Sequence, residues 1–153
     1  MHATTFAALI AALLVSVSAR AEGGSRAPLN PQFQQECGSC HVAFPPRLLD
    51  ASAWHQLMTS LNKHFGNDAS LDAQTRSSIE SYLQHNAATR ERLTPAGKPT
   101  QRITETAWFK REHDEVGAAV WQRASIKQAS NCAACHSQAE QGRFNEHQIH
   151  IPR

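Results

Sequence analysis

The chain is poor in methionine, carries almost balanced charge and has no long apolar run beyond its amino-terminal end. Of 153 residues, 15 are Lys or Arg and 13 are Asp or Glu. This balance gives no reason to expect binding to nucleic acid or to an anionic membrane surface. No segment approaches the roughly 20 consecutive apolar residues needed to cross a bilayer. We therefore expect no transmembrane segment in the mature chain.

Residues 1–21 have the pattern of a secretory signal peptide. The apolar run over residues 6–17 is too short to span a membrane, and Ala19-Arg20-Ala21 supplies an A-x-A cleavage site. The α-amino group alone provides the positive charge expected at the start of such a leader. A buried helix or a membrane anchor is the alternative, which the lack of a second apolar run disfavours. The pattern predicts a protein exported to the periplasm.

The four cysteines form two pairs, and a histidine follows each pair. The two segments are Cys37-Gly38-Ser39-Cys40-His41 and Cys132-Ala133-Ala134-Cys135-His136. C-x-x-C-H is the attachment signature of c-type haem, in which both thiols form thioethers with the porphyrin and the histidine binds the iron. The sequence therefore predicts two covalently bound haem c groups. Their attachment residues are Cys37, Cys40, Cys132 and Cys135, and their proximal ligands are His41 and His136.

Zinc binding and disulfide formation are the competing explanations for two C-x-x-C pairs. The 91 residues between Cys40 and Cys132 far exceed the roughly 15–20 that separate the pairs of a zinc ribbon. A C-x-x-C disulfide is more often part of redox chemistry than a structural crosslink. Neither explanation accounts for the histidine after both pairs, so haem attachment is preferred.

The rest of the chain offers little material for an apolar core, since its mean hydropathy is −0.48. Two buried porphyrins would supply the missing nonpolar surface. We therefore expect the chain without haem to be largely unfolded, as in other proteins whose folding is coupled to the binding of a metal group.

The ligand on the opposite face of each iron determines whether a haem transfers electrons or binds a small molecule. Met1 leaves with the leader, so Met58 is the only available thioether and at most one haem has His/Met ligation. Met58 lies in an apolar stripe, where methionine usually fills core space. Histidines outside the leader and the motifs are more numerous: His55, His64, His85, His113, His147 and His150.

His64 and His113 are the preferred sixth ligands. His64 lies on an apolar face and follows His41 by 23 positions, and His113 precedes His136 by the same interval. We expect His64 to complete the haem at His41 and His113 the haem at His136. Both haems are then six-coordinate, low-spin and low-potential, because a thioether ligand raises the potential relative to a second imidazole.

Three alternatives to this assignment stay open. The two distal histidines could be exchanged between the haems, and His64 could be a core histidine bonded to the backbone. His147 or His150, in the carboxy-terminal tail, could replace His113. We expect His55 and His85 to face solvent.

Helical periodicity without strand signals predicts an all-α fold. One apolar stripe predicts a helix from Asp50 or Ser52 to Phe65, stopped by Gly66. A second helix is predicted over residues 70–84, and residues 22–36 are predicted to be an irregular arm. A third helix, capped by Thr104 or Thr106, is expected to have an apolar face made of Trp108, Phe109, Val116 and Val120.

Two small haem domains follow from this pattern. Residues 22–88 are the N-terminal haem c domain, whose sequence of helices is similar to a class I cytochrome c. Residues 89–101 are charged and contain Pro95, Gly97 and Pro99, which is typical of a linker. Residues 102–153 are the C-terminal haem c domain, which we expect to be poor in helix around its haem.

Longer strings of residues resemble the bacterial dihaem cytochrome c (DHC) family. The strings are Cys37-x-x-Cys40-His41-x-Ala43-Phe44-Pro45-Pro46, Trp54…Leu57-Met58…Leu61…His64-Phe65-Gly66…Ala69-x-Leu71, Arg102-Ile103-Thr104-Glu105-Thr106-x-Trp108-Phe109…Glu112-His113 and Asn131-Cys132-x-x-Cys135-His136. They cover nearly the whole mature chain. The resemblance implies a two-domain periplasmic electron carrier with bis-histidine haems, and His64 and His113 match histidine positions like those of the family. It also implies redox partner proteins, namely a membrane cytochrome b and a small soluble oxygen-binding monohaem cytochrome c.

The preferred function is electron transfer from the membrane cytochrome to the soluble one, without an enzymatic substrate. One alternative is a five-coordinate haem that binds or reduces oxygen, nitric oxide or peroxide. Another is a structural subunit of a larger respiratory complex.

Overall fold

The computed structural model describes residues 29–89 and 100–153. The predicted signal peptide and most of the predicted linker lie outside these ranges. The α-helices within them are α1 (Pro31–Cys37), α2 (Ala51–Thr59), α3 (Ala73–His85), α5 (Ala107–Glu112) and α6 (Ala118–Trp121). Short 3-10 segments are η1 (Pro46–Leu48), η2 (Leu61–Lys63), η3 (Ile103–Glu105), η4 (Cys132–Ala134), η5 (Ala139–Gln141) and η6 (Glu146–Gln148). Neither range contains a strand, which confirms the all-α prediction.

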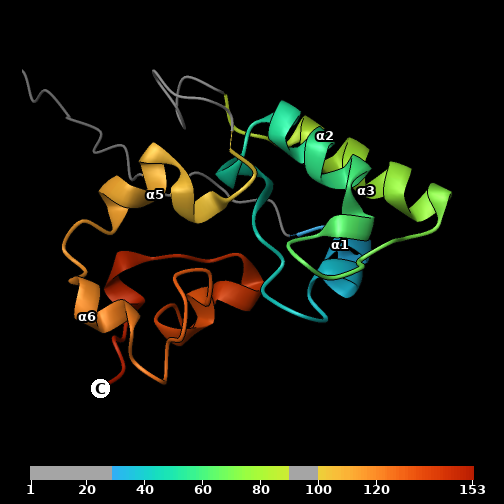
Figure 1. Ribbon diagram of the computed structural model, residues 1–153. Helices are drawn as coiled ribbons and strands as arrows, with labels where there is room; N and C mark the ends of the chain where they lie inside the picture. The colour runs from blue at the N-terminus through green and yellow to red at the C-terminus, as the bar shows by residue number, and fades with distance from the viewer. Residues whose placement is uncertain (1–28, 90–99) are drawn as a thin grey trace, which may run out of the picture.

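The two halves of the chain differ in helix content. In Figure 1, α1, α2 and α3 lie together on one side, and α5, α6 and the carboxy-terminal segment lie on the other. The longest helix of the first half, α3, has 13 residues, whereas α5 has 6 and α6 has 4. Residues from 122 onward contain turns and short 3-10 segments but no α-helix. None of the helices in the described ranges is long and apolar enough to cross a bilayer.

One hydrophobic core is shared by both halves. Phe33, Leu49 and Ile79 of the first half are almost fully buried in the same cluster as Ile103 and Phe109 of the second. A second contact joins the ends of the described chain, because the Leu29 side chain packs against the backbone at Gly142. The halves are therefore packed on each other through apolar side chains.

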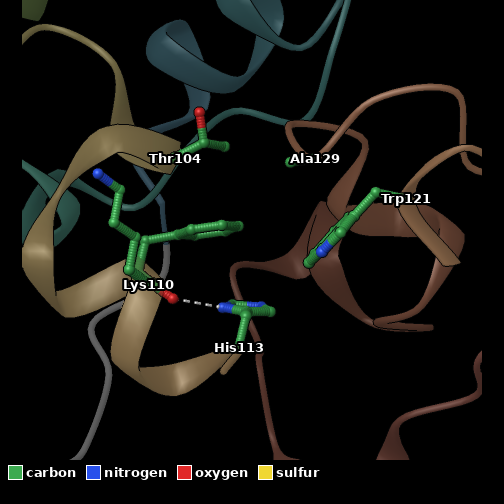
Figure 2. Close-up of a pocket in the computed structure, with 6 residues that line it drawn as sticks. Thr104, Lys110, His113, Trp121 and Ala129 are labelled. Carbon is green, nitrogen blue, oxygen red and sulfur yellow. Dashed lines mark hydrogen bonds between the residues drawn. The ribbon is translucent and has the colours of Figure 1, made fainter. Parts of the chain in front are cut away.

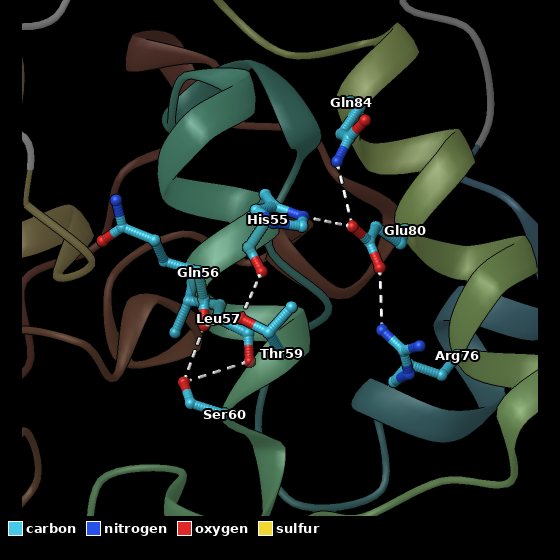
Figure 3. Close-up of polar contacts among 8 residues, drawn as sticks. All are labelled: His55, Gln56, Leu57, Thr59, Ser60, Arg76, Glu80 and Gln84. Carbon is cyan, nitrogen blue, oxygen red and sulfur yellow. Dashed lines mark hydrogen bonds and ion pairs between the residues drawn. The ribbon is translucent and has the colours of Figure 1, made fainter.

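Helices α2 and α3 form the principal helix pair, and a polar cluster ties their exposed edges together (Figure 3). His55 of α2 lies 2.6 Å from one carboxylate oxygen of Glu80 in α3. Arg76 and Gln84, one turn before and after Glu80, each donate to that carboxylate at 3.0 Å. Glu80 is largely covered and has three partners, of which His55 is the one that comes from α2.

Two predictions about the first half were wrong. Residues 31–37 are helical rather than irregular, since the Asn30 side chain accepts the Phe33 N–H at 3.0 Å and Pro31 occupies the first helical position. Helix α2 ends at Thr59 instead of Phe65. The Thr59 and Ser60 hydroxyls donate to carbonyls of the last turn, which terminates the helix before the apolar stripe is complete.

Helix boundaries elsewhere differ less. Helix α3 begins at Ala73, because the Asp72 carboxylate accepts the N–H groups of Gln74 and Thr75. Thr106 caps α5, as one of the two predicted caps. The predicted extension to Val116 and Val120 is wrong, since α5 stops at Glu112. The side chain of His113 donates to the Phe109 carbonyl, the acceptor that its own backbone N–H would use in a continuing helix.

Candidate functional site

The first C-x-x-C-H segment begins at the carboxyl end of α1. Cys37 is the last residue of the helix, residues 38–40 form a turn, and His41 follows in an exposed position. His41 Nδ1 donates to the neighbouring Val42 carbonyl at 2.7 Å. The ring of Phe44 is stacked on the imidazole with 4.8 Å between centroids. These contacts fix the ring and leave Nε2 as the nitrogen that can bind a metal.

His64 lies opposite His41, at the end of η2. The two ring centroids are 6.1 Å apart and the ring planes are inclined by 25°. Nδ1 of His64 is buried without a hydrogen-bond partner. Burial, and to a smaller degree the nearby His41, lowers the pKa of His64 below its usual value. The neutral form thus favoured is the form in which imidazole binds metals.

The second C-x-x-C-H segment repeats this arrangement with a different partner. Cys132 opens η4, and the ring of His136 lies 6.1 Å from that of His113, with the planes inclined by 78°. His113 Nδ1 donates to the Phe109 carbonyl at 2.9 Å (Figure 2). Nδ1 of His136 is buried and unpartnered, and burial, followed by the proximity of His113, lowers the pKa of His136.

A cavity of about 270 Å³ adjoins this second pair (Figure 2). Aromatic and aliphatic groups dominate its wall, and Lys110 is its charged member. The lining residues are Thr104, Phe109, Lys110, His113, Trp121 and Ala129. A wall that combines aromatic rings with a few polar groups is typical of a small-molecule or cofactor site.

Both histidine pairs have the separation expected for one metal ion between two imidazoles. Imidazole nitrogens bind first-row metals at about 2.0–2.1 Å, which places the two ring centroids roughly 6 Å apart. Within the described ranges, Nδ1 of His64 and Nδ1 of His136 are the only buried side-chain nitrogen or oxygen atoms without a hydrogen-bond partner. Such orphaned atoms are uncommon in folded proteins and mark a site of special function. The residues present therefore fit an iron porphyrin held between each pair.

The profile of the dihaem cytochrome c family matches residues 33–144. The chain belongs to this family. Among solved structures, a diheme cytochrome c from Shewanella baltica is 40% identical, with a TM-score of 0.71, covering 82% of this chain and 95% of that one. Two structures of the diheme cytochrome c from Rhodobacter sphaeroides are 46% and 45% identical, with TM-scores of 0.64 and 0.68, each covering 76% of this chain and 97% of the other. Among curated proteins, no relative matches.

Members of the dihaem cytochrome c family bind two haem c groups covalently and transfer electrons. This chain is accordingly a dihaem electron-transfer protein and not an enzyme. None of its four cysteines is paired in a disulfide, so all four thiols are available for thioether bonds to haem. Before haem is attached, burial raises the pKa of the Cys37 thiol to about 11 and that of the Cys132 thiol to about 11.

The other candidate ligands lie elsewhere. Met58 is buried in the core of the first half, with 3% of its surface exposed. His85, His147 and His150 are exposed at the surface. His55 is exposed as well and is paired with Glu80.

Phenylalanines surround the four histidines, a feature that was not predicted from the sequence. Phe44 contacts His41, Phe65 contacts His64, Phe109 contacts His113 and Phe144 contacts His136. Phe33 is the one other phenylalanine in the described ranges, and it is part of the core. Each of the four lies within eight positions of its histidine, so proximity in the sequence was the available signal.

Proposed function

We propose that the protein carries electrons in the periplasm through two bis-histidine haems. The first is attached at Cys37 and Cys40 and bound by His41 and His64. The second is attached at Cys132 and Cys135 and bound by His136 and His113. The observation that carries the proposal is the 6.1 Å separation of the rings in both pairs.

Each residue type has a defined task in this arrangement. The cysteine thiols anchor the porphyrin edge, and the two imidazoles close both faces of the iron against exogenous ligands. When bound, the haem supplies a one-electron Fe(III)/Fe(II) couple. The backbone carbonyls of Val42 and Phe109 accept the Nδ1 protons of His41 and His113, which keeps the opposite nitrogen available for the metal.

Two imidazole ligands predict low reduction potentials for both haems, because a thioether would raise them. A low-potential carrier is suited to take electrons from a membrane cytochrome b and to reduce a small soluble oxygen-binding monohaem cytochrome c. Lys110, at the wall of the cavity beside His113, provides a positive charge where such a partner could approach. Redox encounters of this kind use small, transient interfaces.

Carbon monoxide binding to the reduced holoprotein tests the ligation. The unmodified protein should show low-spin optical and EPR spectra and no rapid change with carbon monoxide. His64→Ala and His113→Ala should each leave one iron without its sixth ligand, so that each reduced variant binds one equivalent of carbon monoxide. His147→Ala and His150→Ala are the matched controls and should bind none. A stoichiometric reaction of the unmodified protein would instead indicate a five-coordinate haem, and one equivalent bound by a control variant would assign that histidine as ligand.

Stopped-flow mixing with a monohaem cytochrome c tests the partner. The rate of electron transfer should fall as ionic strength rises if exposed lysines attract an acidic partner. Lys110→Glu should lower the rate at low salt, whereas Lys63→Glu, in η2 and outside the cavity wall, should lower it less. The absence of electron transfer would contradict the proposed acceptor.

A further inference from the structure

The four histidines are held in two different ways, and each pair contains one histidine of each kind. His41 and His113 donate Nδ1 hydrogen bonds to backbone carbonyls. Each is also stacked face-on against a phenylalanine, with ring planes inclined by 22° at Phe44 and 20° at Phe109. A hydrogen bond and a stacked ring together prevent rotation of these two imidazoles about their side-chain bonds.

His64 and His136 have neither restraint. Their Nδ1 atoms lack hydrogen-bond partners, and the phenylalanine beside each meets the imidazole edge-on. The Phe65 ring lies 4.9 Å from that of His64 at 60°, and the Phe144 ring lies 5.2 Å from that of His136 at 65°. The rotation of these two imidazoles is therefore restrained by packing, to which Phe65 and Phe144 each contribute an edge-on ring.

The backbone and the neighbours of Phe65 and Phe144 bear on where these two rings lie. Phe65 has a backbone φ of 48°, which a bulky residue rarely adopts, and the Arg102 guanidinium lies 4.3 Å from the centre of its ring. Phe144 follows Gly142, whose backbone, at φ 69°, packs closely on the Leu29 side chain. The Phe65 ring is thus held by a residue from the other half of the chain, and Phe144 lies two positions after a residue that packs against the other half.

The two sites differ in the angle between their imidazole planes, which is called the twist below. The imidazole planes are inclined by 25° for His41 and His64 and by 78° for His113 and His136. We propose that Phe65 and Phe144 are positioning residues that set this twist, nearly parallel in the first pair and nearly perpendicular in the second. The proposal rests on the bis-histidine ligation proposed above.

The twist has a spectroscopic consequence that follows from ligand-field chemistry. An imidazole donates π-electron density to the iron d orbital perpendicular to its ring plane. Parallel rings act on the same orbital and separate it from its partner, which gives a rhombic low-spin ferric EPR signal. Perpendicular rings act equally on both orbitals and leave them close in energy, which gives a highly anisotropic signal with a large maximal g value.

Low-temperature EPR of the oxidised holoprotein tests the proposal. We expect one rhombic and one large-g low-spin signal of equal spin concentration. Phe144→Leu should shift the large-g signal and leave the rhombic one in place, and Phe65→Leu should do the reverse. Phe144→Tyr, which keeps the aromatic ring, should give the same signal as the unmodified protein. Phe44→Leu is the matched control and should have the smallest effect, because His41 keeps its hydrogen bond.

Arg102→Ala gives an independent test at the surface, where folding is least at risk. Removing the guanidinium should broaden or shift the rhombic signal alone. Two superimposable low-spin signals in the unmodified protein would overturn the proposal, as would a large-g signal that survives Phe144→Leu unchanged. Either result would leave the ligation intact. A high-spin ferric signal in the unmodified protein would instead refute the ligation itself.

Discussion

The imidazole rings of His41 and His64 lie 6.1 Å apart, although one residue follows α1 and the other follows η2. The two sides of the first candidate haem site therefore come from separate segments. The same holds for the second site, where His113 follows α5 and His136 follows η4. As a consequence, either distal histidine can be changed without touching a C-x-x-C-H motif.

Replacing a distal histidine with methionine should raise the potential of one haem. His64→Met and His113→Met are each expected to raise one of the two midpoint potentials by on the order of 0.1 V, within the roughly 0.8 V range that axial ligands span. The physical reason is that a thioether is a weaker donor to ferric iron than imidazole. Spectroelectrochemical titration measures both potentials. His85→Met, on the exposed end of α3, is the control and should change neither.

Loss of one attachment site should remove one haem and much of the local structure. Cys132→Ser with Cys135→Ser should lower the mass by one haem and unfold part of residues 102–153, because that half has only short helices around its site. Mass spectrometry and far-UV circular dichroism report the two effects. The chain without either haem should lose most of its helical signal. A native-like spectrum of the haem-free chain would contradict the coupling of folding to haem binding.

The helix cap at Asp50 should contribute measurably to stability. Its carboxylate is buried and accepts from the Ala53 N–H and the Ser52 hydroxyl, both at 2.8 Å. Asp50→Ala should lower the free energy of unfolding by about 1–2 kcal/mol. Asp72→Ala removes the equivalent but exposed cap of α3 and should cost less. Denaturant titration of the holoprotein compares the two, and an equal loss would show that burial of the cap has no effect.

Two positions with positive φ should respond in opposite directions. Lys127 has φ 66°, so Lys127→Gly should stabilise the fold by about 1 kcal/mol and raise the melting temperature by roughly 2–6 °C. Gly142 has φ 69°, and an added Cβ would lie 3.3 Å from Leu29. Gly142→Ala should therefore destabilise by about 1–2 kcal/mol. Thermal melts of both variants measure the effect, and destabilisation by Lys127→Gly would contradict it.

The attachment residues and one ligand of each candidate site could be proposed from the sequence because these residues are adjacent in it. The C-x-x-C-H segments specify attachment residues and one ligand each, and the shortage of methionine directs attention to histidine. The pairs His41 with His64 and His113 with His136, chosen from spacing and apolar pattern, are the pairs that the structure brings together.

Helix ends were harder to predict, since side-chain hydrogen bonds and tertiary contacts determine them. The apolar stripe continues past Thr59, but hydroxyl groups terminate α2 there, and Phe65 adopts a positive φ that Arg102 supports from the other half. In contrast, the Asn30-Pro31 start of α1 was a local signal. The aromatic contacts of His64 and His136 depend on the folded chain and have no signature beyond proximity.

The shared core has a consequence for attempts to divide the molecule. Cutting the chain between the two C-x-x-C-H segments would expose Ile103 and Phe109 on one fragment and their apolar neighbours on the other. Leu29 would likewise lose the surface that it covers at Gly142. Neither half is therefore expected to fold independently, and a separately expressed single-haem fragment should be prone to aggregation.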